Sequence, residues 1–132
     1  MGAYAPEISG GAFGQSRERF EALVCWLEGQ QAQELTHGEL ETRLQDEGRE
    51  LLRALTQDHL DLRAQQEPRL AQVVGADGVR RAHAETGRTR EVATVFGPVT
   101  LRRLTYRQPG HAGLHPAEAM LNLPAEKYSH GL

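Results

Sequence analysis

The first half of the chain repeats apolar residues at intervals of three and four, which is the spacing of an amphipathic helix. The earliest stripe consists of Phe20, Leu23, Val24 and Leu27. Ser16 is a favourable N-cap residue, and Glu18 would lie in the first turn, where the helix dipole stabilises an anion. A helix is therefore expected to begin at Ser16. Residues 1–15 hold few large apolar groups, which predicts a flexible tail.

The start of a second helix is marked more strongly. Thr36 stands three residues before Glu39, which is the spacing of a capping box, and Leu35 and Leu40 flank the cap as a hydrophobic staple. Gly48 interrupts the pattern and predicts a turn or a break. Two helices around a glycine-containing turn are compatible with a helix-turn-helix.

A third helix is expected from about Arg49 to Gln66, ending before Pro68. Its leucines share one side, namely Leu51, Leu52, Leu55 and Leu62. Its basic and acidic side chains cancel, whereas a helix that reads DNA presents mainly basic and amide groups. DNA reading by this helix and plain helical packing or dimerisation are both open, and the charge balance favours the second.

Beyond Gly75 the pattern changes to the alternation typical of β-strands. The expected strands are 79–85, 90–96 and 99–107. Turns are expected at 86–88 and at Gly97-Pro98, with a bulge near Arg103. We predict a three-stranded antiparallel sheet whose apolar face is covered by the helices and whose other face displays arginines. The fold class is therefore α+β, with N-terminal helices followed by a small antiparallel β-sheet.

These patterns divide the chain into four segments. They are a flexible tail (1–15), a helical region (16–68), a small antiparallel sheet (73–107), and a loop with the start of a following domain (108–132). The chain ends in PAEKYSHGL, a sequence typical of the beginning of an element. We therefore expect the following domain to be truncated.

Charge is unevenly distributed, although the 132 residues have a formal net charge of only −3. Residues 1–78 hold 7 basic and 14 acidic side chains, whereas residues 79–107 hold 7 arginines and 2 glutamates. A local basic face can bind phosphate while the rest of a protein repels it. The candidate DNA-binding residues are Arg80, Arg81, Arg88, Arg90, Arg102, Arg103 and Arg107. A solvated strand face is the alternative interpretation of the same cluster.

The sequence contains no complete catalytic constellation. It lacks the GxSxG, HExxH, GxxxxGK[ST] and GxGxxG motifs. His111 and His115 are four residues apart, but the prolines and glycines around them disfavour the helix that would join them in a metal site. Cys25 is expected to be a buried small hydrophobe, and Asp58 and Asp61 to be surface charges. We predict no catalytic residue, metal ligand or cofactor.

Two features bear on the location of the protein. No window reaches the roughly 18 consecutive apolar residues of a membrane span, and the N-terminus has no secretory signal pattern. Cys25 is the only cysteine, which excludes a disulfide within the chain. We therefore expect a cytoplasmic protein in a reducing compartment.

Five segments resemble, in order, the N-terminal part of bacterial insertion-sequence transposases of the ISKra type. They are FEALVCWLEGQQAQELTHGELETRL, GRELLRALTQDHLDLRAQQ, VVGADGVRRAHAETGR, TVFGPVTLRRLTYR and LHPAEAMLNLPAEKYSHGL. The resemblance covers about 110 of the 132 residues. Its most specific part is TVFGPVTLRRLTYR followed by LNLPAEKYSHGL.

This resemblance implies a role in moving DNA. Such transposases join a DNA-recognising N-terminal region to a nuclease core of the RNase H type, in which three acidic residues hold divalent metal ions. The core would follow the segment matching LPAEKYSHGL, and no acidic residue present matches its triad. We therefore expect a truncated, non-catalytic part of a transposase that is not an enzyme on its own. The implied partners are DNA at the element ends, a second copy of the chain, or a full-length transposase.

Two alternatives belong to other classes of protein. The leucine-rich helices and the acidic first half suggest a helical dimerisation or interaction module without DNA affinity. A decayed transposase remnant is the other alternative, because an intact capping box and strand alternation indicate only that the chain can fold. Salt-sensitive binding to duplex DNA distinguishes the transposase hypothesis from both.

Overall fold

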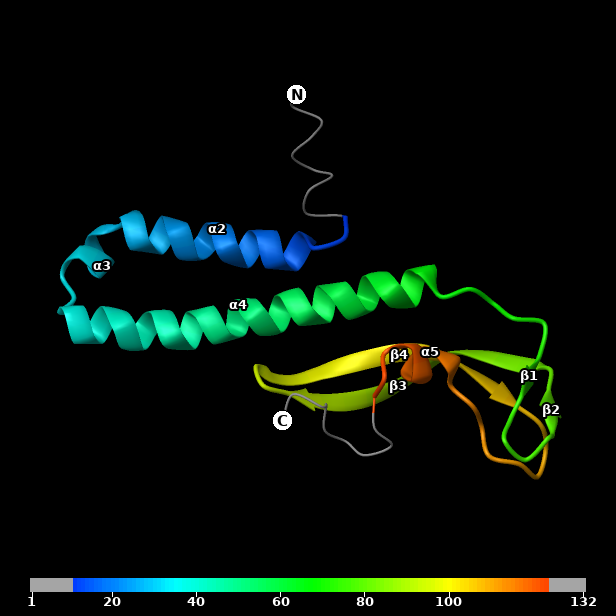
Figure 1. Ribbon diagram of the computed structural model, residues 1–132. Helices are drawn as coiled ribbons and strands as arrows, with labels where there is room; N and C mark the ends of the chain where they lie inside the picture. The colour runs from blue at the N-terminus through cyan, green and yellow to red at the C-terminus, as the bar shows by residue number, and fades with distance from the viewer. Residues whose placement is uncertain (1–10, 124–132) are drawn as a thin grey trace.

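The computed structural model describes residues 11–123 and shows helices followed by two small antiparallel sheets (Figure 1). The helices are α2 (Gly14–Glu28), α3 (Gln30–Gln33), α4 (His37–Gln66) and α5 (Pro116–Met120). The strands are β1 (Val73–Val74), β2 (Arg80–Arg81), β3 (His83–Thr94) and β4 (Gly97–Arg107). The predicted α+β fold is confirmed.

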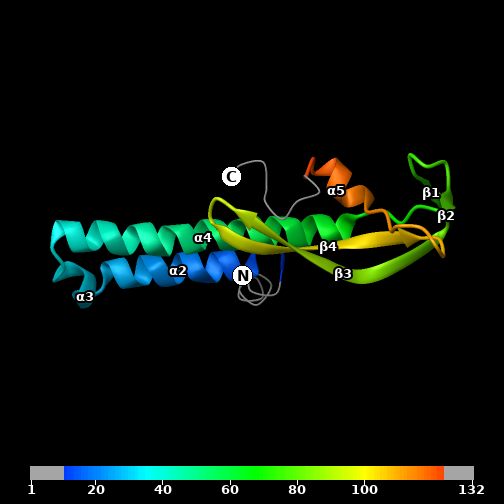
Figure 2. The ribbon, with the colours of Figure 1, turned by 90° about the horizontal axis from the view of Figure 1, so that it is seen from below.

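Helices α2 and α4 form an antiparallel hairpin joined by the short α3 (Figures 1 and 2). The capping box that the sequence predicts at the start of α4 is present. The Glu39 backbone N–H donates to Thr36 Oγ1 at 3.2 Å, and the Thr36 backbone N–H donates to the Glu39 carboxylate at 2.9 Å. This cap fixes the beginning of a helix of 30 residues.

The expected break at Gly48, and with it the helix-turn-helix, is wrong. Helix α4 continues through Gly48 without interruption, and Gly48 is not among the glycines with positive φ. A glycine inside a helix costs about 1 kcal/mol relative to alanine. That cost is too small to end a helix of strong helix-forming residues, such as Leu44 and Leu51, that also packs against other elements.

The predicted start of the first helix at Ser16 is also wrong. Helix α2 begins at Gly14, so residues 14 and 15 belong to it rather than to a flexible tail; residues 1–10 lie outside the described part. Ser16 is 2% exposed, and its backbone N–H and hydroxyl donate to Asp58 Oδ2 at 3.0 and 2.6 Å. Asp58, expected on the surface, is therefore a buried acceptor that joins α4 to α2.

The strands form two separate two-stranded sheets rather than the predicted three-stranded one. Residues 86–88, expected to be a turn, stay within β3 as an irregularity between Glu85 and Arg88. Gly87 has a φ of 79°, which supplies the backbone conformation of a bulge. The bulge therefore lies in β3, across from the predicted position in β4, and one bent strand replaces two short ones.

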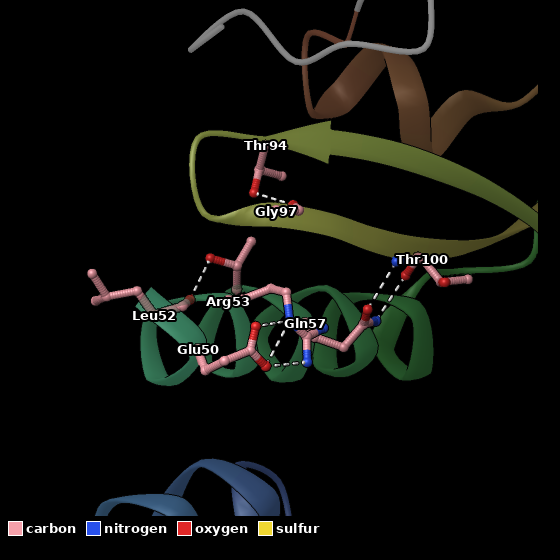
Figure 3. A network of polar contacts seen from close by, with 8 residues as sticks. Glu50, Leu52, Arg53, Gln57, Thr94, Gly97 and Thr100 are labelled. Atoms are coloured by element: carbon pink, nitrogen blue, oxygen red, sulfur yellow. Dashed lines mark hydrogen bonds and ion pairs between the residues drawn. The ribbon is translucent and has the colours of Figure 1, made fainter. Parts of the chain in front are cut away.

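The turn between β3 and β4 consists of Val95 and Phe96, so the predicted turn at Gly97-Pro98 is displaced by two residues. Gly97 opens β4 with a φ of 116°, a conformation that favours glycine. The Thr94 hydroxyl donates to the Gly97 carbonyl at 2.6 Å and steadies this end of the hairpin (Figure 3).

Helix α4 runs along the outer edge of β4 and satisfies its backbone groups. The Gln57 side-chain amide donates to the Thr100 carbonyl and accepts from the Thr100 backbone N–H, both at 2.8 Å (Figure 3). Further along, the Leu104 backbone N–H donates to the Glu67 carboxylate at 3.0 Å. Side chains of one helix thus occupy an edge that would otherwise be open to another strand.

The apolar core lies in the β3–β4 hairpin. Val92, Val99 and Leu101 are each 2% exposed, and three partly buried leucines, Leu60, Leu121 and Leu123, pack against them. By contrast, the buried apolar residues of the described helices are only Ala32 and Ala54. The α2–α4 hairpin therefore leaves its large apolar side chains partly exposed.

The segment after β4 pairs with the end of that strand and then forms a short helix. Leu114 pairs with the backbone of Tyr106 through hydrogen bonds of 2.8 and 2.9 Å, and α5 follows. The Tyr106 hydroxyl accepts from the Leu70 backbone N–H at 2.7 Å. The expected loop corresponds to residues 108–115, whereas the new element expected in PAEKYSHGL, residues 124–132, lies outside the described part.

Candidate nucleic-acid interface

The seven arginines predicted to bind DNA lie in three strands. Arg80 and Arg81 are in β2, Arg88 and Arg90 in β3, and Arg102, Arg103 and Arg107 in β4. Arg88 pairs with Arg103 across the hairpin, and Arg90 pairs with Leu101. Cross-strand partners share a face, and alternate residues share it too. Arg88, Arg90 and Arg103 therefore lie on the same face as the core residues Val92 and Leu101.

The expected arginine-covered open face is wrong. The opposite face of the β3–β4 hairpin carries Arg102 together with Thr89, Glu91 and Thr100. On this face Arg102 is the single arginine, paired with Thr89, and Glu91 is paired with Thr100. The seven arginines therefore do not form one continuous basic patch on the sheet.

Two of the arginines share the single carboxylate of Glu118 in α5. Arg90 Nη1 and Arg103 Nε lie 2.7 and 2.8 Å from its two carboxylate oxygens. The side chains of Arg90, Arg103 and Glu118 are 14%, 11% and 17% exposed. Burial opposes ionisation of Glu118, but the Arg103 hydrogen bond and the surrounding positive charges outweigh it and lower the pKa of the carboxyl. The two ion pairs from Glu118 anchor α5 on the β3–β4 hairpin.

Arg81 is also committed to the fold. It is 2% exposed and makes two hydrogen bonds to the Asp77 carboxylate, at 2.9 and 3.1 Å. It also donates to the carbonyls of Val79 and Ala112, at 2.9 and 2.8 Å. The hydrogen bonds from Arg81, with that from the Val79 backbone N–H, hold the pKa of Asp77 well below its usual range. Arg81 thus ties the β1–β2 turn to the loop after β4.

Glu85 serves two further arginines at the bulge. It accepts from Arg107 Nε and lies 3.4 Å from Arg88 Nε. The hydrogen bond from Arg107 is the main cause of the lowered pKa of Glu85. The side chains of Arg88 and Arg107 are 53% and 40% exposed, so one carboxylate faces two accessible guanidinium groups. Their combined charge is positive and open to solvent.

The arginines with accessible charge are thus Arg80, Arg88, Arg102 and Arg107. The side chains of Arg80 and Arg102 are exposed and, within residues 11–123, have no hydrogen bond or ion pair. Sequence reasoning overestimated the basic segment because Asp77 and Glu118 lie outside residues 79–107. Asp77 is only four residues from Arg81, but Glu118 is 28 and 15 residues from Arg90 and Arg103, and only the fold brings it to them.

The other chemistry-bearing residues are dispersed. In the part of the chain that the structure describes, no three His, Cys, Asp or Glu side chains are placed to hold a metal ion. His111 and His115 each lie near a different carboxylate, of Asp77 at 4.0 Å and of Glu118 at 3.8 Å. Both carboxylates also bind arginine.

Cys25, predicted to be buried, is exposed. Ser16 marks the side of α2 that faces α4, and Cys25 comes nine residues later. Nine residues at 100° each place Cys25 on the opposite side of the helix. The neighbouring Trp26 lies on the side of α2 that faces α4, where the Arg43 guanidinium carbon stacks over its ring at 4.7 Å from the ring centroid.

No protein-family model, curated protein or solved structure matches the chain. The described helices include none that is both long enough and apolar enough to cross a lipid bilayer.

The pKa shifts predict that acid destabilises the fold in two stages. Burial is the main cause of the lowered pKa of His115, so the unfolded chain takes up its proton first and stability begins to fall below pH 6.5. The pKa of Glu118 is lowered from 4.5 in the folded chain. The ionised carboxylate therefore stabilises the fold above about pH 4.5, and this stabilisation is lost as the pH falls below that value. Urea unfolding across this pH range should show both declines. A His115→Gln variant should lack the first, and a decline unchanged in that variant would contradict the assignment.

Proposed function

We propose that this chain is the non-catalytic N-terminal part of a DNA transposase and that it contributes DNA binding. The resemblance to ISKra-type transposases supports the assignment to this class, and its most specific segment, residues 94–107, is the turn and second strand of the β3–β4 hairpin. In this proposal, cleavage and strand transfer belong to a nuclease core outside these 132 residues. This chain holds DNA rather than cutting it.

The observation that carries the DNA-binding proposal is the accessible positive charge of the strand region. Arg80 and Arg102 are exposed without a carboxylate partner among the described residues, and Arg88 and Arg107 share one. Arginine at such positions pairs with phosphate through charge-assisted hydrogen bonds. The acidic helical half repels the same phosphates, which would orient the strand region toward DNA.

This arrangement sets the salt dependence. If four arginines contact phosphate, the slope of log affinity against log salt is about −3.6. Removing two of them by Arg80→Ala/Arg102→Ala should reduce the magnitude of that slope by about 2 and weaken binding to all duplex sequences alike. Fluorescence anisotropy with a labelled duplex over a series of salt concentrations measures both effects.

A matched control removes two arginines from the helical hairpin. Arg19 and Arg43 are exposed, so Arg19→Ala/Arg43→Ala lowers the net charge equally. The control should keep the wild-type slope, because these side chains belong to the acidic half. An equal loss in both variants would show that only net charge matters and would contradict an interface in the strand region.

A second function, association with another transposase chain, is favoured by a different observation. Phe20, Leu52 and Leu55 of the helical hairpin are 50%, 44% and 37% exposed. A pair of helices that buries no large apolar side chain gains little hydrophobic stabilisation by itself. We propose that the helical hairpin pairs with a second copy of the chain or with the same segment in a full-length transposase.

A further inference from the structure

The helical hairpin has one polar side and one apolar side. On the more polar side, a cavity of about 600 Å³ between α2 and α4 is lined by charged residues such as Glu18, Arg19, Arg43 and Glu47, together with the apolar Ala22, Leu23, Trp26 and Ala54. Phe20 and Val24 each follow a residue that lines the cavity, Arg19 and Leu23. One residue corresponds to a rotation of about 100° around the helix, so their side chains point away from the cavity. The leucines on the corresponding side of α4 are Leu44, Leu51, Leu52, Leu55 and Leu62.

This apolar side, defined by Phe20, Val24 and those five leucines, is incompletely buried within one chain. None of its members belongs to the buried core, and its most exposed members, Phe20, Leu52 and Leu55, lie close together along the hairpin. We propose that two copies of this chain associate through it in an antiparallel arrangement about a twofold axis, forming a four-helix bundle. The proposal deepens the second proposed function and is independent of DNA binding.

Charges at the borders of the apolar side select the antiparallel arrangement. Arg17 and Glu28 border it on α2, and Glu41 and Arg63 border it on α4. Reversing one hairpin against the other places Arg17 opposite Glu28 of the second copy, and Glu41 opposite Arg63. At the levels set by the Ser16–Asp58 contact, a parallel arrangement would instead place Arg17 opposite Gln57 and Glu28 opposite Asp46, so that neither border charge meets an opposite charge. Only the antiparallel bundle brings unlike charges together on both borders.

One axis satisfies both pairs of charges. The contact between Ser16 and Asp58 shows that these two residues lie at the same height along the hairpin axis. Because α2 and α4 are antiparallel, moving one residue toward the C-terminus of α2 corresponds to moving one residue toward the N-terminus of α4. Residues 22 and 52 therefore lie at the same level. The midpoint between Arg17 and Glu28 falls between residues 22 and 23, and the midpoint between Glu41 and Arg63 is Leu52. The same twofold axis thus passes both midpoints, with Leu52 against Leu52 of the second copy.

Gly48 gives independent support. It lies on this side of α4, where a Cβ atom would meet nothing within 4 Å in the chain itself. Neither packing nor positive φ within one chain requires glycine at this helical position. A small residue does allow a neighbouring helix to approach closely. The antiparallel arrangement brings Thr56 of the second copy over Gly48.

The test measures the mass of the full chain in solution, without DNA, by light scattering. At about 100 μM, well above a micromolar dissociation constant, we expect twice the chain mass of 14.6 kDa. Leu52→Glu would bring two carboxylates together on the axis and should raise the dissociation constant by at least about 100-fold. Leu52 is 44% exposed in the single chain, so helix content by circular dichroism should not change. Ala22→Glu adds the same charge on the polar side and should remain dimeric.

A charge exchange tests the direction of the two hairpins. Glu41→Arg places arginine opposite Arg63 and should weaken the dimer, and adding Arg63→Glu should restore it. A monomer at every concentration, or a dimer insensitive to Leu52→Glu, would overturn the proposal. Failure of the double variant to restore association would overturn the antiparallel arrangement. A monomer that still binds a full-length transposase through Leu52 would identify that chain, instead of a second copy, as the occupant.

Discussion

Replacing Glu118 with alanine should lower the free energy of unfolding by about 2–3 kcal/mol. The substitution leaves Arg90 and Arg103 beside each other, 14% and 11% exposed, without the carboxylate they share. Breaking a fully buried ion pair costs about 3–5 kcal/mol, and the partial exposure of these three side chains reduces that figure. The loss should also release α5 from the hairpin.

Urea denaturation followed by circular dichroism measures this effect. Glu91→Ala is the matched control, because Glu91 is an exposed carboxylate on the open face of the same hairpin. The control should change the free energy of unfolding by less than about 0.5 kcal/mol. If both variants behaved alike, Glu118 would be a surface charge rather than the anchor of α5.

Asp58→Ala should lower the free energy of unfolding by about 2 kcal/mol, because it removes the acceptor of two hydrogen bonds from a buried serine. The Ser16 backbone N–H and hydroxyl would then lose their shared partner, and α2 would separate from α4 more readily. Hydrogen exchange along α2 should accelerate by a larger factor than exchange in β4.

Two substitutions separate this effect from simple loss of charge. Asp58→Asn keeps an acceptor oxygen and should recover part of the stability. Asp61→Ala removes an exposed carboxylate one turn away, where its only hydrogen bond among the described residues comes from the Gln57 side chain at 3.0 Å. An Asp61→Ala loss as large as that of Asp58→Ala would contradict the special role of the buried contact.

Features that depend on neighbouring residues could be predicted from the sequence. The capping box at Thr36 and Glu39 is local chemistry, and the start of α4 follows from it. The change from helical spacing to alternation also places the strands after the helices, which gives the α+β class. Gly48 misled the prediction because a weak local preference was weighed without the length of the helix that carries it.

The candidate site could be predicted only in part, because charge in a sequence segment is not charge on a surface. Arg81, Arg90 and Arg103 belong to the basic run, yet Asp77 and Glu118, which form ion pairs with them, come from before and after it. The bulge at Gly87 also places Arg90 on the face that α5 covers. Of the seven arginines, only Arg80 and Arg102 have the exposed side chain that the pattern predicted and no ion pair among the described residues.

The most direct test of the proposed function adds the wild-type chain to a labelled DNA duplex and measures the fluorescence anisotropy of the duplex. The duplex carries the terminal sequence of the insertion element to which the proposed transposase belongs. A scrambled duplex of equal length is the comparison, at about 50 and 200 mM salt. We predict tighter binding to the terminal sequence, and a loss of affinity of about 100-fold at the higher salt for four phosphate contacts. Absent binding, or binding that salt does not weaken, would contradict the account and leave the arginines as part of the fold alone.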